Sequence, residues 1–139
     1  MRSGYTILEH PADFGIEACG ATLGEAFVRA AEGLMSIIVE PSSVEIRDSR
    51  ELRVQSTDVE QLVVRWLSEI VFLYDGKRFV GKEFVVKEIT DTALCAAVNG
   101  ECFDARRHVT CLDVKAITYH QIRVAQQDDG FLVRVYVDI

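Results

Sequence analysis

The sequence has no long hydrophobic run. No stretch approaches the roughly 18 uninterrupted apolar residues of a membrane helix. The first twenty residues, which include Glu9, Asp13 and Glu17, lack the apolar core of a signal peptide. We therefore expect a soluble, cytoplasmic protein that makes no contact with membranes.

The sequence also lacks an excess of positive charge. It carries 15 Lys and Arg against 22 Asp and Glu, a formal charge of -7, and its only adjacent basic pairs are Lys77–Arg78 and Arg106–Arg107. Proteins that grip phosphate backbones by charge are normally basic. Strong direct nucleic-acid binding is therefore not expected, and the charge favours basic proteins and metal cations as partners.

Cysteine and proline are sparse. The four cysteines form no CxxC pair, which excludes zinc-ribbon and thioredoxin-like sites, and we expect them to be reduced. With two prolines and no low-complexity run, the chain shows no linker. A length of 139 residues, 49% of them hydrophobic, predicts one domain over residues 1–139.

Two segments have helical periodicity. Residues 22–39 begin with Thr22 and Glu25 at the spacing of a capping box, and residues 56–77 repeat the device with Thr57 and Glu60. Apolar residues follow at three- to four-residue spacing in both segments, over more than one stripe. Each segment therefore predicts a helix packed deeply against a sheet.

The remaining segments alternate with period two, which predicts six or seven strands. They are residues 5–9, 15–20, 44–56, 79–90, 93–104, 114–125 and 131–139. Asp91 and the run Asp128–Asp129–Gly130 are hairpin turn signals. The pattern predicts an α+β fold in which two helices pack on a mostly antiparallel or mixed sheet of about six to seven strands.

Two stretches are candidates for chemistry. In "EHPADFGIEACG", His10 and Asp13 flank Pro11 in what is either a functional loop or a turn that Asp13 caps. At the other end, a free α-carboxylate at Ile139 follows Asp138, so a strand end presents two anionic groups. Either these groups are solvated, or a cation offsets their repulsion. Oxygen ligands favour Mg²⁺ and Ca²⁺ over zinc.

A third stretch, residues 100–122, concentrates charged and aromatic residues. A regular strand over residues 114–125 would place Lys115 and His120 on opposite faces, which argues against one acid–base pair. Nothing in the stretch has the spacing of a zinc site, a nucleophile elbow or a phosphate loop.

Three blocks together resemble the archease family, the protein cofactors of RtcB-type RNA ligases. They are "HPADFGIEACG", "WLSEIVFLYDGKRF", and "FDARRHVTCLDVKAITYHQIRV" with a terminal "VYVDI". The likeness spans essentially the whole chain. Pro11 stands where the family often has threonine, which removes a hydrogen-bond donor but no ligand.

The resemblance implies a protein that assists an enzyme and is not itself catalytic. It implies a divalent metal, Ca²⁺ or Mg²⁺, held by Asp13, Asp138 and the carboxylate of Ile139. The partner implied is an RtcB-type RNA ligase in tRNA splicing or RNA repair, whose GTP-dependent guanylylation and turnover the protein promotes. His10, Lys115 and His120 are candidates for supporting the metal ligands or contacting the ligase.

Two rival functions stay open. One is a chaperone-like modulator of RNA-modification enzymes such as a tRNA methyltransferase. The other is a metal-dependent hydrolase that uses the same carboxylates. The sequence makes no prediction about self-association.

Overall fold

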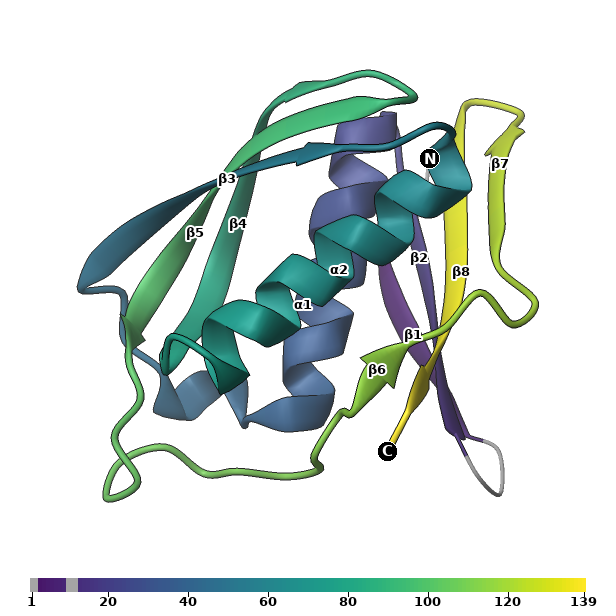
Figure 1. Ribbon diagram of the computed structural model, residues 1–139. Coiled ribbons are helices and arrows are strands. Elements are labelled where there is room, and N and C mark those ends of the chain that lie inside the picture. The colour runs from purple at the N-terminus through teal and green to yellow at the C-terminus, as the bar shows by residue number, and fades with distance from the viewer. Residues whose placement is uncertain (1–2, 10–12) are drawn as a thin grey trace.

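The structure is a computed structural model that describes residues 3–9 and 13–139. Within these residues, two α-helices and eight strands form an α+β fold with two antiparallel sheets (Figure 1). The predicted fold class is confirmed, although the strands divide between two sheets. Helix α1 spans Leu23–Ile38 and α2 spans Val59–Asp75, and a short 3-10 helix spans Pro41–Ser43.

The larger sheet has five strands. They are β1 (Gly4–Glu9), β2 (Asp13–Gly20), β6 (Ala116–Ile117), β7 (Arg123–Gln127) and β8 (Gly130–Asp138). Strand β8 is central: β2 pairs with one of its edges, and β6 and β7 pair with different parts of the other. The last strand is therefore held on both sides along most of its length.

The smaller sheet has three strands in the order β3-β5-β4. They are β3 (Asp48–Gln55), β4 (Phe79–Ile89) and β5 (Ala93–Cys102). Two register shifts in β4 mark irregularities in its pairing with β5. The predicted hairpin at Asp91 joins β4 to β5, and the one at Asp128–Asp129 joins β7 to β8.

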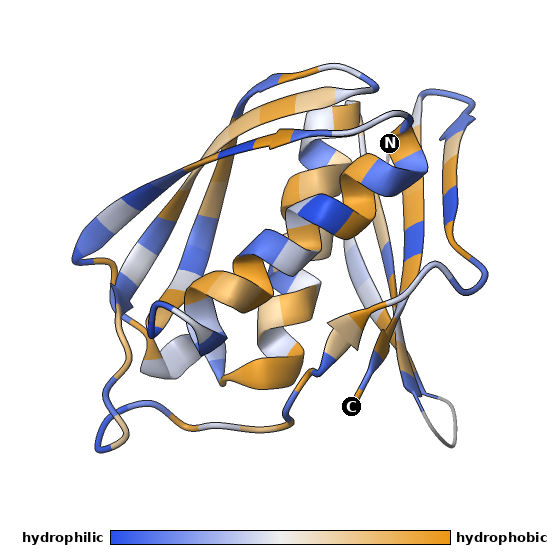
Figure 2. Ribbon diagram, in the orientation of Figure 1, coloured by the Kyte–Doolittle hydropathy of each residue, from blue (hydrophilic) through white to orange (hydrophobic). Residues whose placement is uncertain are grey.

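One hydrophobic core unites the helices and both sheets. Helix α1 packs against β2 of the larger sheet and β4 of the smaller one, and Figure 2 shows hydrophobic residues along both helices. Trp66 of α2 is fully buried, donates from Nε1 to the carbonyl of Phe27 in α1 at 3.1 Å, and meets the Phe84 ring of β4 edge-on. The indole thus ties three elements together and satisfies its own polar atom.

The helix starts follow capping rules with one correction. Thr22 caps α1 as predicted, because its hydroxyl accepts from the amide of Glu25 at 3.1 Å. The prediction of Thr57 and Glu60 for α2 is wrong: Asp58 is the N-cap and accepts from the amide of Gln61 at 2.8 Å. Both alternatives fit an S/T/D-x-x-E/Q pattern one residue apart, so the sequence alone does not choose between them.

The predicted strand over residues 114–125 is wrong in its middle. Only Ala116–Ile117 and Arg123–Gln127 are strands, and a turn at His120 and Gln121 separates them. Gln121 has a φ of 51°, in the left-handed region that a continuous strand does not use. The argument that Lys115 and His120 lie on opposite faces of one strand therefore loses its premise.

Neither helix of the described chain is long and apolar enough to cross a membrane.

Candidate functional site

Asp13 and Asp138 lie directly opposite one another at the end of the larger sheet. Asp13 is the first residue of β2 and pairs in register with Asp138, the last residue of β8. Directly opposed residues of an antiparallel pair place their side chains on the same face, with Cβ atoms about 5 Å apart. The fold therefore brings together two carboxylates that are far apart in the sequence, as the resemblance implies.

The Asp13 carboxylate has an unusual environment. Among the residues described, Oδ1 of Asp13 is the only buried side-chain oxygen or nitrogen atom without a hydrogen-bond partner. Asp138 is exposed, and Ile139 is half-buried with its side chain packed against the core. Opposed like charges destabilise a sheet, and an unpaired buried carboxylate oxygen costs more still. A cation bound here would offset both costs.

The donors at this position are all oxygen, which suits Ca²⁺ or Mg²⁺. Within the described residues, here or elsewhere, no group of three or more His, Cys, Asp or Glu side chains is arranged to hold a metal. The set that the resemblance implies contains two such side chains, Asp13 and Asp138, and its third member would be the carboxylate of Ile139. The residues present thus fit a hard divalent cation.

Lys115 enters the site through its backbone. Its amide donates to the carbonyl of Asp138 at 2.8 Å, and the next two residues form β6 beside Val137 and Asp138. The Lys115 side chain is exposed and makes no ion pair within residues 3–9 and 13–139. Figure 1 shows the C-terminus in the lower part of the molecule beside β6, and Asp138 pairs with the start of β2.

Tyr136 forms the floor beside the two carboxylates. It lies two residues before Asp138 on the same face of β8 and is only 5% exposed. A Cβ atom on Gly15, its partner in β2, would lie 2.7 Å from Cε1 of the Tyr136 ring. Glycine is therefore required at residue 15 because the tyrosine ring covers it.

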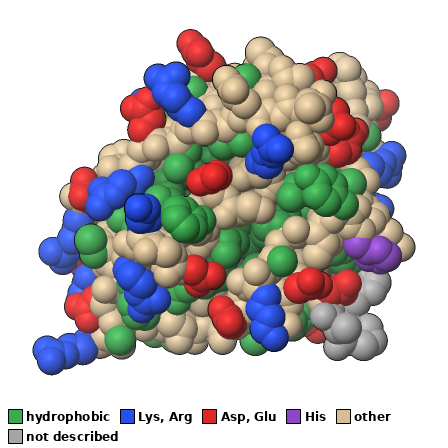
Figure 3. All heavy atoms as spheres, viewed as in Figure 1, with side chains coloured by type: hydrophobic (Ala, Val, Ile, Leu, Met, Phe, Trp, Pro, Cys, Tyr) green, Lys and Arg blue, Asp and Glu red, His purple; other side chains and the backbone are tan. Residues whose placement is uncertain are grey.

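His120 packs against Tyr136 and, among residues 3–9 and 13–139, makes no hydrogen bond or ion pair with either carboxylate. Its ring centroid is 6.0 Å from that of Tyr136 in an edge-on arrangement, and its amide donates to Thr118 Oγ1. In Figure 3 a histidine and several acidic side chains gather at the lower right of the molecule. The predicted candidate His10 lies outside the described residues.

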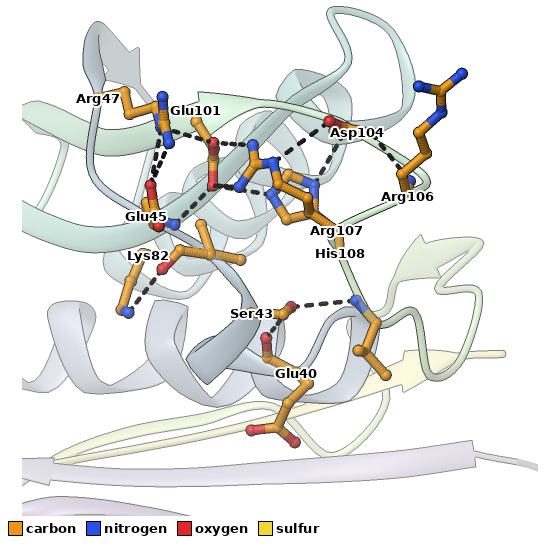
Figure 4. Close-up of polar contacts among 12 residues, drawn as sticks. Glu40, Ser43, Glu45, Arg47, Lys82, Glu101, Asp104, Arg106, Arg107 and His108 are labelled. Carbon is orange, nitrogen blue, oxygen red and sulfur yellow. Dashed lines mark hydrogen bonds and ion pairs between the residues drawn. The ribbon is translucent and has the colours of Figure 1, made fainter.

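A second polar cluster surrounds Glu101, near the end of β5 (Figure 4). Glu101 is 3% exposed, and its carboxylate accepts from the amide of Glu45 at 2.6 Å, from His108 Nε2 at 2.9 Å and from the Arg107 guanidinium. Hydrogen bonds from Arg107 chiefly, then His108 and Glu45, outweigh burial and lower the Glu101 pKa to about 2.

The comparisons with known proteins agree with one another. The sequence model of the Archease protein family (MTH1598/TM1083) matches residues 5–139. The protein archease of Sulfurisphaera tokodaii is 32% identical over 136 residues, which cover 97% of this chain and 98% of that protein. This chain belongs to the archease family.

Two solved structures are similar to this chain. The solution structure of protein 1598 of Methanobacterium thermoautotrophicum is 29% identical, superposes with a TM-score of 0.83, and covers 98% of this chain and 99% of that one. A crystal structure from Thermotoga maritima, named an archease and possible chaperone, has 18% identity and a TM-score of 0.62, and covers 100% and 98% of the two chains. At that identity the second structure supports the fold alone.

The sequence did not reveal the Glu101 cluster as a site. Glu101, Asp104, Arg107 and His108 were all visible as charged residues of one stretch, but no known motif joins them. The alternation of β5 also points Glu101 away from the helices, since Leu94, Ala96 and Val98 face the core. The carboxylate is buried because the following segment folds back over it, which the strand pattern does not show.

Proposed function

We propose that this archease activates an RtcB-type RNA ligase, promoting its GTP-dependent guanylylation and multiple turnover in tRNA splicing or RNA repair. The observation that carries the proposal is the register pairing of Asp13 with Asp138, together with the buried Oδ1 of Asp13 that lacks a hydrogen-bond partner among the described residues. Family membership supports the choice of a partner-directed role over an independent one.

The chain's own residues divide the work of the site. Asp13, Asp138 and the carboxylate of Ile139 would hold Ca²⁺ or Mg²⁺, with Asp13 on the buried side and Asp138 on the exposed side. When bound, the cation supplies charge compensation of the kind a triphosphate needs during nucleotidyl transfer. Lys115, which is exposed next to Asp138, offers a positive contact to the ligase or its nucleotide.

The proposed role is that of a protein cofactor and not of a free-standing enzyme. A general base needs a side chain within hydrogen-bond reach of the reacting group. His108 is buried and engaged by Glu101 and the amide of Asp104, and His120 packs against Tyr136. Within the described part of the chain, neither histidine forms a hydrogen bond or an ion pair with Asp13 or Asp138. A role as a metal-dependent hydrolase therefore has less support than a role as a ligase activator.

A second function, a chaperone-like modulator of RNA-modification enzymes, is favoured by one observation. The Thermotoga maritima relative is named a possible chaperone. In this alternative, a tRNA methyltransferase is the partner and the carboxylate pair has no role in the effect.

The deciding experiment is multiple-turnover RNA joining by the RtcB-type ligase of the same organism. It is run with catalytic amounts of wild type, of Asp138→Asn and of Asp91→Asn, a control that removes one carboxylate at the exposed β4–β5 turn. We expect wild type and the control to sustain turnover and Asp138→Asn to fail. If none of the three changes the rate, the activator role is wrong and the modulator role is preferred. If Asp138→Asn works as well as wild type, the carboxylate pair is not the functional site.

A further inference from the structure

The segment that carries Lys115 to Asp138 is anchored at several residues. We call residues 103–115, which join β5 to β6 beneath the ends of the helices, the strap (Figure 1). The amides of Cys111 and Leu112 donate to the carbonyls of Ile38 and Ile37 in the last turn of α1, at 2.8 and 3.0 Å. These bonds satisfy helix-end carbonyls that have no partner inside the helix. The strap contains no named strand, and these hydrogen bonds attach it to the end of α1.

Two more contacts hold the strap against the segment that follows α1. The amide of Glu40 donates to the carbonyl of Val109 at 2.8 Å, and the amide of Val109 donates to Ser43 Oγ at 3.1 Å (Figure 4). Val114, one residue before Lys115, is 2% exposed and belongs to the core. The strap is thus bonded to the end of α1 and to the segment after it, and Val114 fixes it to the core directly before Lys115.

The first end of the strap is closed by His108. Its Nδ1 accepts from the amide of Asp104 at 2.9 Å, so Nε2 carries the hydrogen and donates to Glu101 Oε2. The amide of His108 also donates to the carbonyl of Asp104 at 2.9 Å. Residues 104–108 therefore form a closed turn whose position is set by the Glu101 carboxylate.

Glu101 joins this turn to a third segment. It accepts from the amide of Glu45, and Arg47 Nε lies 3.4 Å from its Oε1. In Figure 4 the carboxylate lies between Glu45 and Arg47 on one side and Arg107 and His108 on the other. Buried ionic clusters are often less stable than well-packed apolar replacements, and some are retained because they fix one arrangement of the chain.

We propose that Glu101 is a positioning residue for the functional site: through the Glu101–His108 contact and the strap, it sets the position of Lys115 against Asp138. The proposal rests on the ligase-activating role for its effect on activity, and on the contacts above for its effect on structure. It predicts that a substitution at Glu101 weakens the hydrogen bond between the Lys115 amide and the Asp138 carbonyl, at the far end of the strap.

The structural test is amide hydrogen exchange in Glu101→Gln. We expect protection of the Lys115 amide to fall by about tenfold, while amides in the middle of α2 keep their protection. Glu83→Gln is the matched control, because Glu83 accepts from Asn99 Nδ2 at 2.8 Å on the same sheet but does not contact the strap. Unchanged protection at Lys115 in Glu101→Gln would overturn the proposal.

Two variants at His108 distinguish loss of the Glu101 contact from general misfolding. His108→Gln keeps a side-chain donor that can reach Glu101, whereas His108→Ala removes it. We expect the glutamine variant to retain most of the Lys115 protection and the alanine variant to lose it. Equal behaviour of the two variants would mean that the Glu101 contact does not position the strap.

The functional test is a double-mutant cycle in the RNA-joining assay. If Glu101 acts through Lys115, the double variant Glu101→Gln with Lys115→Ala is no more impaired than Lys115→Ala alone. Multiplied losses would show that Glu101 acts elsewhere, for example through stability, and would contradict the proposal. If wild type fails to stimulate the ligase, the activator role fails, and the exchange measurements still decide whether Glu101 positions Lys115.

Discussion

At the scale of single residues, the placement of Asp13 and Asp138 is expected to lower the stability of the fold. They oppose each other across β2 and β8, and Asp13 Oδ1 is buried without a hydrogen-bond partner in the described chain. Such an arrangement is expected to weaken the metal-free fold, and a bound cation would offset the cost. Removing one of the two carboxylates should therefore raise the stability of the metal-free protein and lower its affinity for the cation.

Asp138→Asn tests this opposition. Without metal, removing one of two opposed charges is expected to raise the free energy of unfolding by about 0.2–1 kcal/mol. With millimolar Ca²⁺ or Mg²⁺, the wild type gains stability by ligand binding and the variant does not. Urea denaturation with and without cation measures both effects, with Asp91→Asn as control. A variant that is less stable without metal, or equally stabilised by it, would contradict the account.

Glu101 predicts a pH dependence with a definite sign. Its pKa is about 2 in the folded protein and near 4.5 as an ordinary carboxyl, so it is deprotonated more readily when folded. The stability it contributes is therefore present above about pH 4.5 and is lost as the pH falls toward 2.

Glu101→Gln should remove that dependence. At pH 7 we expect a loss of about 3 kcal/mol in the free energy of unfolding, at the low end for a broken buried pair because Arg107 and Arg47 can turn to solvent. The difference from wild type should shrink between pH 4.5 and 2, as measured by chemical denaturation. A constant difference over that range would show that the Glu101 charge is not what stabilises the fold.

At the scale of elements, the β2–β8 pairing is what shapes the site. Gly15 and Tyr136 are register partners next to the carboxylates, and the tyrosine ring occupies the space of the missing side chain. A change at this pair therefore alters the packing beside Asp13 and Asp138 without changing either carboxylate.

Gly15→Ala is expected to destabilise the protein by about 1–3 kcal/mol, because the new methyl group overlaps the Tyr136 ring. It should also weaken Ca²⁺ binding as the two strands move apart. Gly24→Ala is the control: its Cβ would meet its nearest neighbour, Val86, at 3.4 Å, and alanine favours the helix by about 1 kcal/mol. Thermal unfolding and calcium titration of both variants test the difference. If Gly15→Ala changes neither the unfolding temperature nor calcium binding, the close packing of Tyr136 over Gly15 is wrong.

Local patterns predicted most of these elements and failed where contacts between distant segments decide. Both helices were found from apolar spacing, and both hairpins from their turn residues. The interruption at His120 and Gln121 was missed because residues 114–125 alternate as a strand does. The division into two sheets also depends on pairings between distant strands, which alternation does not encode.

At the scale of the whole molecule, the fold closes on its last strand. β8 lies between β2 on one side and β6 and β7 on the other, so residues from both ends of the sequence and from the strap meet at Asp138. The pairing of Asp13 with Asp138 followed from resemblance to the archease family, not from spacing. The Glu101 cluster is made by the strap folding back, and only the structure reveals it.

The most direct test of the activator account is transfer of GMP from GTP to the partner ligase in a single turnover. It is measured with labelled GTP and the ligase alone, or with wild type, Asp91→Asn, or the double variant Asp13→Asn with Asp138→Asn. The account predicts faster guanylylation with wild type and with Asp91→Asn, and the rate of the ligase alone with the double variant. Equal acceleration by wild type and the double variant would contradict it.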